Sequence, residues 1–370
     1  MAKRLYRYFF TPIFLVVLVL NSYGQRGFSD PGNFAFWQNR LKLSESTSTP
    51  KELLSTRSIV LISAYNQDDA YNSRSNWHSI SDECHRFFAA MGIDPVMYYY
   101  LEDVFAGAEV SKGIAAEIQK REIANLIFID KSKKSGRDFY IIAVTTFNGK
   151  ETFADAGQEA WYIDGESLTG MMRPMARRIE SNSGRKENLL IIERPEYFRP
   201  SGMIRARRNE TYMIDLRIEN IAISETLLGD KTKADASSGA DKEPDTEIEI
   251  IFSKYPYKHG YVDLNLSDEE LRRRGFQYKL MQIHTANSQA RKFLNYKDKG
   301  DEKAFTTHQL QADGTISKKD LPANATIYKY YVKHIYTGDV YLGEFWDAAT
   351  TWQEALNNYL DFTIKALERK

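Results

Sequence analysis

Acidic side chains follow three consecutive apolar segments of this 370-residue chain, and each segment is typical of a β-strand. If the three strands are parallel, their carboxyl ends meet at one edge of the sheet, where open α/β proteins bind ligands. Converging carboxylates favour a hard divalent cation, which can activate water for hydrolysis. The alternative is that these residues cap the helices that begin there. The candidate metal ligands are Asp68 and Asp69 after residues 58–63, Glu102 and Asp103 after residues 94–101, and Asp130 at the end of residues 125–130.

A second candidate metal site lies on one helix face. His78, Asp82 and His85 have i, i+4 and i+7 spacing, so two imidazoles and a carboxylate point the same way and suit zinc or another transition ion. No fourth ligand is evident, and an ordinary polar helix face is the alternative. Cys84, the only cysteine, lies on the apolar side of the same helix, which indicates a buried, inert thiol and excludes an intramolecular disulfide.

No complete catalytic motif is present in the sequence. We find no G-x-S-x-G elbow, no H-E-x-x-H, no Walker loop and no G-x-G-x-x-G after a strand. Adjacent Cys84 and His85 would point about 100° apart on a helix, so they do not form a nucleophile and its base. The sequence therefore favours a protein without catalytic activity.

Tyrosine is abundant, with 23 residues, and it clusters in two strand-like segments. Strand periodicity puts Tyr328, Tyr330, Val332, His334 and Tyr336 on one face of the second segment. Tyrosine suits both sheet packing and protein interfaces, because its ring packs while its hydroxyl remains hydrated. The alternative to a partner-binding face is packing within the sheet. The candidate partner-binding residues are Tyr98, Tyr99, Tyr100, Tyr328, Tyr330 and Tyr336.

Alternating helices and apolar strands position these residues and predict a layered α/β fold with an α+β tendency. The hairpin in the first half, with Asn148-Gly149 as a two-residue turn, indicates a mixed sheet. A long strand is expected over residues 209–224 and a final helix near the C-terminus. In the first half, strands are expected at 58–63, 94–101, 125–130 and 188–193, helices at 75–92, 109–123 and 168–179, and the hairpin at 138–155.

Landmarks of several kinds recur at nearly one offset, which predicts a diverged tandem duplication of this domain. The middle of each half does not align, since residues 125–130 have no clear counterpart near Gly314. The paired landmarks are Ile59 with Ile248, Gly149 with Gly338, Phe139 with Tyr328, Ser81–Glu83 with Ser267–Glu269, and Trp161 with Trp352.

Composition sets the domain boundaries. Residues 225–246 are rich in Gly, Ser, Asp and Lys and have few large apolar side chains, so they are expected to be a flexible linker. The expected organisation is a signal peptide (1–24), an N-terminal lead (25–56), a first α/β domain (57–200), a connecting strand (201–224), the linker (225–246) and a second α/β domain (247–370).

The first 24 residues have the layout of a secretory signal peptide. Basic residues precede an apolar run from Phe9 to Leu20, and small residues at Ser22 and Gly24 suit cleavage before Gln25. The run is short for a membrane span, and the fifty Lys and Arg residues balance fifty Asp and Glu residues, which argues against nucleic acid as a partner. We therefore expect an exported protein, periplasmic or secreted, with no membrane span after signal removal.

Together these features predict a non-catalytic binding or assembly module of the cell envelope, in which two related domains present aromatic faces to a protein partner. No cofactor is expected. The alternative is a metal-dependent hydrolase that holds a divalent cation at the acidic strand ends.

Overall fold

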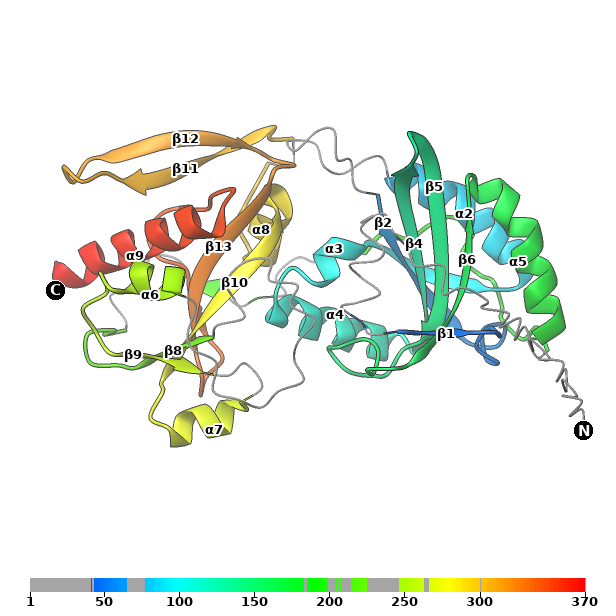
Figure 1. Cartoon of the computed structure of the whole chain (residues 1–370), viewed down its shortest axis with the longest axis horizontal. Helices are drawn as coiled ribbons and strands as arrows, with labels where there is room; N and C mark the ends of the chain where they lie inside the picture. Colours follow the sequence, from blue (N-terminus) through cyan, green and yellow to red (C-terminus); the bar gives the residue numbers. More distant parts are fainter. Residues whose placement is uncertain are drawn as a thin grey trace, which may run out of the picture.

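The chain folds into two layered α/β domains, each built on a mixed six-stranded sheet (Figure 1). The predicted α/β class is therefore confirmed. We call the domain of β1–β6 and α2–α5 domain 1, and the domain of β7–β14 and α6–α9 domain 2. The computed structural model describes residues 41, 43–64, 77–182, 185–198, 204, 206–207, 214–224, 246–262, 266–299 and 301–369.

The sheet of domain 1 has the strand order β1-β6-β5-β4-β2-β3. Its centre is parallel, because β2 lies between β3 and β4 and runs in the same direction as both. β5 is antiparallel to both β4 and β6, and β1 is parallel to β6. The strands are β1 (Ser44–Ser46), β2 (Arg57–Ser63), β3 (Asp94–Tyr100), β4 (Ile123–Lys134), β5 (Arg137–Thr146) and β6 (Glu159–Gly165).

The sheet of domain 2 repeats this topology strand for strand, in the order β7-β14-β13-β10-β8-β9. The relative directions of neighbouring strands are also the same. A short helix, α8, and a separate two-stranded hairpin, β11–β12, are inserted between β10 and β13. The strands are β7 (Ala206–Arg207), β8 (Ile221–Ser224), β9 (His259–Val262), β10 (Tyr278–Ala286), β11 (Ala304–Leu310), β12 (Ile316–Pro322), β13 (Thr326–His334) and β14 (Val340–Tyr341).

Only some of the sequence landmarks occupy equivalent places in the two sheets. Gly149 and Gly338 both lie in the connection to the last strand of their sheet, and Phe139 and Tyr328 both lie in the strand before it. The other pairs do not correspond, since Ile59 is in β2 whereas Ile248 is in a helix. The counterpart of β4 is β10, well before Gly314. Tandem duplication therefore stays a prediction, now with matched topology in its favour.

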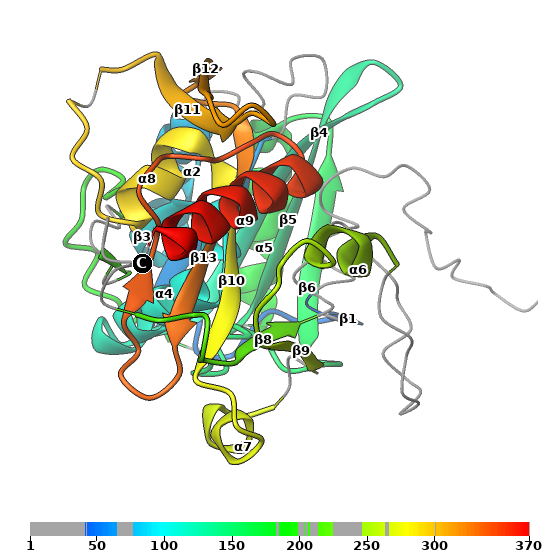
Figure 2. The same ribbon diagram turned by 90° about the vertical axis from the view of Figure 1, so that its left-hand side faces the viewer.

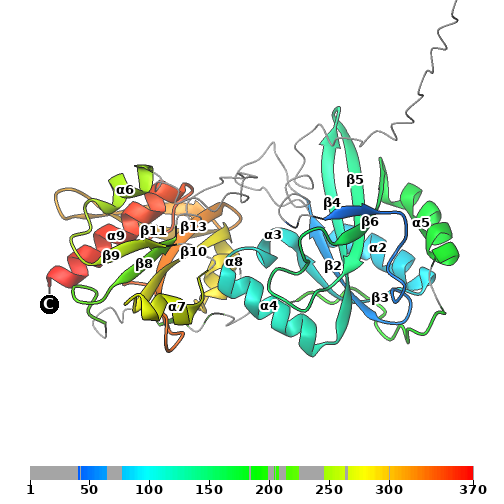
Figure 3. The same cartoon turned by 60° about the horizontal axis from the view of Figure 1, so that its bottom comes forward.

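Helices cover the outer face of each sheet, and further helices lie between the sheets (Figures 1 and 3). One apolar cluster joins the inner faces of both sheets, so the two domains pack together. Separate clusters bury the outer faces under α2 and α5 in domain 1 and under α6 and α9 in domain 2. Figure 2 shows α9 lying across β10 and β13. The helices are α2 (Trp77–Met91), α3 (Leu101–Val104), α4 (Ala108–Lys120), α5 (Leu168–Asn182), α6 (Thr246–Phe252), α7 (Asp268–Arg273), α8 (Asn287–Phe293) and α9 (Trp352–Glu368).

The layering explains the continuous apolar run in β2. Side chains alternate across a strand, so Ile59 and Leu61 enter the inner cluster whereas Val60 and Ile62 enter the outer one. A strand that is buried on both faces has apolar residues at successive positions, instead of apolar and polar residues in alternation. None of the helices in the described ranges is both long and apolar enough to span a membrane.

Three expected strands are wrong or shorter than predicted. Residues 188–193 form no strand, and Leu190 there has a positive φ of 50°. Within 209–224 only β8 is a strand, and it lies inside the sheet of domain 2 rather than connecting the domains. Residues 246–252 form helix α6, whereas the pairing of Ile248 with Ile59 of the first strand implied a strand there. The signal peptide (1–24) and nearly all of the predicted linker (225–245) lie outside the described residues.

Candidate functional site

The parallel centre of domain 1 brings acidic residues from two strand ends together. Ser63, the last residue of β2, is the register partner of Asp130 in β4. Glu102 lies in the first turn of α3, which follows β3 directly. Because Asp130 and Ser63 have the same parity as Phe128 and Leu61, they face the inner layer between the sheets. We call Ser63, Glu102 and Asp130 the Asp130 site.

Asp130 is a buried carboxylate without a good hydrogen-bond donor among the described residues. Its side chain is 1% exposed, and neither carboxylate oxygen accepts a hydrogen bond of good geometry from them. Ser63 Oγ instead donates to Glu102 Oε1 at 2.6 Å. Burial, followed by the charge of Glu102, raises the pKa of Asp130 to about 7, and the nearby hydroxyls of Ser63 and Ser132 oppose this shift. The site therefore concentrates negative charge where water does not screen it.

The other acidic residues of the predicted metal site are not brought into this group. Asp103 is turned toward domain 2, where Thr285 Oγ1 donates to its Oδ1 at 2.5 Å. Asp68 and Asp69 lie outside the described residues. Of the five predicted ligands, the structure brings together Glu102 and Asp130.

The predicted ligands on α2 are separated by their hydrogen bonds. His85 is buried, with Nδ1 3.0 Å from the hydroxyl of Tyr98 and Nε2 donating to the carbonyl of Ile192 at 3.0 Å. Asp82 Oδ1 accepts from the hydroxyl of Tyr197. Burial lowers the pKa of His78, although Asp82 opposes the shift. Throughout the described part of the chain, no group of three His, Cys, Asp or Glu side chains is placed to hold a metal ion.

Most of the tyrosines predicted to bind a partner are in the core. The side chains of Tyr98, Tyr99 and Tyr100 are buried, and residues 196–198 cover the edge of β3 through hydrogen bonds with Tyr98. In β13 the predicted alternation of faces is correct, but α9 covers the aromatic face, so Tyr330 is buried and Tyr328 is half-buried against His284. Only Tyr336, at 76% exposure, is widely accessible among these six tyrosines.

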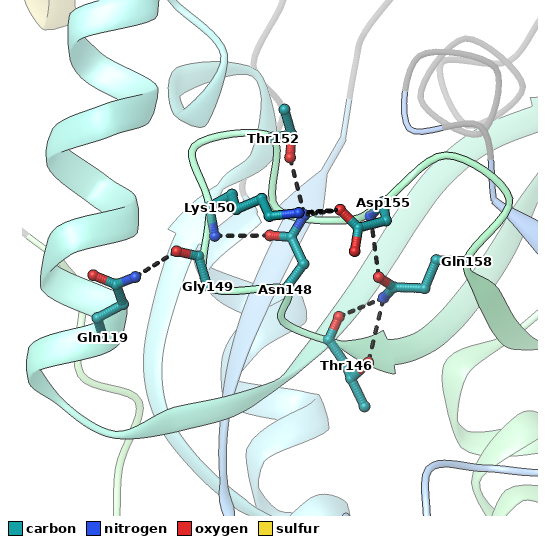
Figure 4. A network of polar contacts seen from close by, with 8 residues as sticks. All are labelled: Gln119, Thr146, Asn148, Gly149, Lys150, Thr152, Asp155 and Gln158. Atoms are coloured by element: carbon teal, nitrogen blue, oxygen red, sulfur yellow. Dashed lines mark hydrogen bonds and ion pairs between the residues drawn. The ribbon is translucent and has the colours of Figure 1, made fainter.

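A network of polar contacts organises the loop between β5 and β6 (Figure 4). This loop, residues 147–158, replaces the predicted two-residue Asn148-Gly149 turn. Lys150 Nζ contacts Asp155 Oδ1 at 2.9 Å, and Asn148 Nδ2 donates to the same oxygen at 3.2 Å. The hydrogen bonds from Lys150 and Asn148 lower the pKa of Asp155. Because these groups satisfy one another, the network explains the loop conformation rather than a ligand site.

An apolar groove of about 450 Å³ lies between α2 and α5 on the outer surface of domain 1. Residues of α5 at i, i+3/i+4 and i+7 form one wall, and residues near the C-terminal end of α2 form the other. The residues that line the groove repeat at helical spacing in the sequence. The sequence does not show, however, which residues of each helix face remain uncovered by other segments. The lining residues of this α2–α5 groove are Phe87, Ala90, Met91, Thr169, Met172, Arg173, Ala176 and Glu180.

Domain 2 contains a buried ion pair that the sequence analysis missed. Lys329 Nζ lies 2.6 Å from Asp347 Oδ1, with side-chain exposures of 0% and 2%. The ammonium also donates to the carbonyls of Tyr330 and Leu342. Burial lowers the pKa of Lys329 and raises that of Asp347. These partners satisfy the charge, so the pair is structural.

Comparisons of the chain with protein-family models, with curated proteins and with solved structures found no match. The residues and their geometry therefore carry the functional argument.

Proposed function

We propose that the chain is an exported, non-catalytic binding protein of the cell envelope that docks a protein partner in the α2–α5 groove. The layout of the N-terminal sequence supports export. The observation that carries the binding proposal is the groove itself, because an uncovered apolar concavity between two helices is the kind of surface that receives the apolar face of a partner helix. Tyr98, Tyr99, Tyr100 and Tyr330 are buried and no longer support a docking face.

The occupant that fits this groove is an amphipathic helix of the partner. On α5, Thr169, Arg173, Ala176 and Glu180 form a stripe over twelve residues, which is about 16 Å of helix and matches the length of about three turns of a partner helix. Methionine side chains in the lining adapt to varied apolar anchors. The opposite charges of Arg173 and Glu180 at the rim favour a helix with an acidic residue at one end and a basic residue at the other.

Two large apolar side chains are exposed in a segment that runs beside the C-terminal end of α2. Leu189 and Ile191 are 81% and 77% exposed, which is unusual for large aliphatic residues. Their segment is anchored beside the groove, because Asn188 Nδ2 donates to the carbonyl of Gly92, the residue that follows Met91. The groove and this segment can therefore contact one partner.

Photo-cross-linking in the producing cells tests the proposal. A photoreactive residue is placed at Ala90 in the groove and, as a control, at Arg273 on the exposed surface of α7 in domain 2. We expect a discrete cross-linked product from Ala90 and none from Arg273. The product from Ala90 should be lost when Ala176→Arg obstructs the groove, and it should survive Ala312→Arg in the exposed β11–β12 turn.

The same cross-linking comparison can contradict the proposal that the partner docks in the groove. A product that persists in the Ala176→Arg variant, or that forms equally from Arg273, would show that the partner docks elsewhere. No product from Ala90 in cells would also contradict the proposal. Thermal unfolding of both arginine variants checks that each change leaves the fold intact.

A metal-dependent hydrolase is the second candidate function. One observation favours it, namely the raised pKa of about 7 and the burial of Asp130 beside Glu102, since perturbed carboxylates concentrate at functional sites. Hydrolysis would require a cation at the strand ends. The test is release of product from model ester and phosphate substrates with added Mg²⁺, which Asp130→Asn should abolish.

A further inference from the structure

We propose that the Asp130 site binds one divalent cation, coordinated by the carboxylates of Asp130 and Glu102 and the hydroxyl of Ser63. The starting observation is the burial of Asp130, whose two oxygens lack a well-placed donor among the described residues. A buried carboxylate in that state destabilises the fold unless a positive charge or a proton compensates it. Such a group in a native protein calls for an explanation, and a bound cation is one.

The geometry brings the three side chains to one point. Asp130 and Ser63 are register partners on adjacent parallel strands and face the same side. Ser63 Oγ is 2.6 Å from Glu102 Oε1, which places the second carboxylate over this strand pair. The mutual repulsion of Glu102 and Asp130 gives the position a net attraction for a cation of charge two.

The donor set selects the chemical class. All three side chains offer oxygen, with no imidazole or thiolate, and this favours Mg²⁺ or Ca²⁺ over zinc or copper. Two carboxylates and a hydroxyl are fewer ligands than a dedicated cage provides. Mg²⁺ nevertheless binds proteins commonly through one or two carboxylates and retains several waters.

This site lies beside the contact between the domains. Glu102 is followed by Asp103, which accepts a hydrogen bond from Thr285 of domain 2. Three residues further on, the carbonyl of Ala106 accepts from the backbone N–H of His284 at 2.8 Å. A cation that holds Glu102 against β2 and β4 therefore also fixes the segment that domain 2 packs on. This role is independent of the α2–α5 groove, which lies on the opposite face of the sheet.

Calorimetric titration of the purified chain, residues 25–370, with MgCl2 and then CaCl2 after chelator treatment tests the proposal. The titration is done near pH 8, where Asp130 with its pKa of about 7 is mostly ionised. We expect a single site and a rise in Tm with either or both ions. Asp130→Asn and Glu102→Gln should each weaken binding at least ~10-fold, because each removes one of two charged ligands. Asp164→Asn, an exposed carboxylate of the same sheet, should change nothing.

The same titration can overturn the proposal of a cation site. Absence of binding heat and of any Tm shift up to about 10 mM cation, above the range of weak extracellular calcium sites, overturns the proposal. In that case Asp130→Asn alone should raise Tm near pH 8, because the substitution removes a buried negative charge that no cation compensates. Ser63→Ala provides a milder variant if an acidic-residue variant does not fold. Failure here leaves the cross-linking result unaffected.

Discussion

Asp130 and Lys329 are both ionisable residues in buried positions, but their surroundings neutralise them differently. Lys329 has Asp347 and two backbone carbonyls as partners. The pKa of Asp130 is raised first by its burial and then by the charge of a second carboxylate, Glu102. At the residue scale, the partners of Lys329 neutralise its charge within the fold. The charge of Asp130 beside Glu102 destabilises the fold unless a ligand or a proton neutralises it.

Asp130→Asn should remove a pH dependence of stability. In the presence of chelator, the folded chain keeps the Asp130 proton up to its raised pKa of about 7, whereas the unfolded chain loses it near the ordinary value. This contribution is complete below the unfolded pKa and is lost as pH rises, by about 4 kcal/mol between roughly pH 4 and pH 8. The variant should therefore be more stable than the parent above about pH 7.

Urea unfolding at several pH values measures this effect, with Asp164→Asn as the control. Parallel stability profiles for the parent and Asp130→Asn over that range would contradict the prediction.

Removing one partner of the Lys329–Asp347 pair should destabilise the protein strongly. Asp347→Asn leaves a buried ammonium without its counter-ion, and we expect a loss of about 3–5 kcal/mol in the free energy of unfolding. The double variant Lys329→Met with Asp347→Asn removes both charges and should recover part of that loss. Denaturant unfolding of the three chains checks this. A double variant that is no more stable than Asp347→Asn alone would contradict the prediction.

Elements were predictable from sequence where one periodicity dominates. The α2, α4 and α5 helices and strands β2 and β3 match their expected ranges within a few residues, because their apolar residues repeat at a single period. α6 was missed because its sequence, TEIEIIF, satisfies two periods. The pairing of Ile248 with Ile59 implied a strand here, but the structure buries Ile248, Ile251 and Phe252 at helical spacing and leaves Ile250 69% exposed.

The N-terminal cap of α9 should contribute measurably to stability. Thr351 Oγ1 accepts a hydrogen bond from the backbone N–H of Glu354 and so satisfies one free donor of the first turn. Thr351→Ala should cost about 1 kcal/mol in the free energy of unfolding. The neighbouring Thr350→Ala change, at an exposed position before the helix, should stay within about 0.5 kcal/mol of the parent. Equal effects of the two substitutions in urea unfolding would rule out the cap as the cause.

At the scale of the whole molecule, the two domains share one inner core. The α3–α4 segment of domain 1 meets β10 and β13 of domain 2, and Lys333 Nζ contacts Glu109 Oε1 at 2.5 Å across this boundary. This packing does not fit two independent modules on a flexible connection, in which each domain would present its own aromatic face. Docking in a groove of domain 1 alone is consistent with it.

Gly107 should be essential to this packing because of close backbone approach. A Cβ atom at this position would lie 2.6 Å from the carbonyl oxygen of Gln282 in β10, and neither backbone can move independently. Gly107→Ala should therefore destabilise the protein by about 1–3 kcal/mol and increase amide exchange in β10. Ala108→Ser, at the adjacent exposed position, is the control. Unchanged exchange in β10 would mean that α4 does not rest closely on domain 2.

The sequence by itself determined the α/β class, the main elements of domain 1, the final helix and the alternation of faces in β13. These features depend on hydrogen bonding and side-chain direction within one segment, so a local period is enough to predict them. The acidic strand ends were also visible, and the candidate site begins with two of those residues, Glu102 and Asp130.

Tertiary structure decided which of these features is exposed, paired or buried. It placed α9 over Tyr330, turned Asp103 toward Thr285 at a sequence separation of 182 residues, and left the α2–α5 groove uncovered. A period shows which side chains share a face, but it does not show which distant segment covers that face. That outcome depends on the packing of the two sheets against each other, because only the assembled core sets the partners of each buried group.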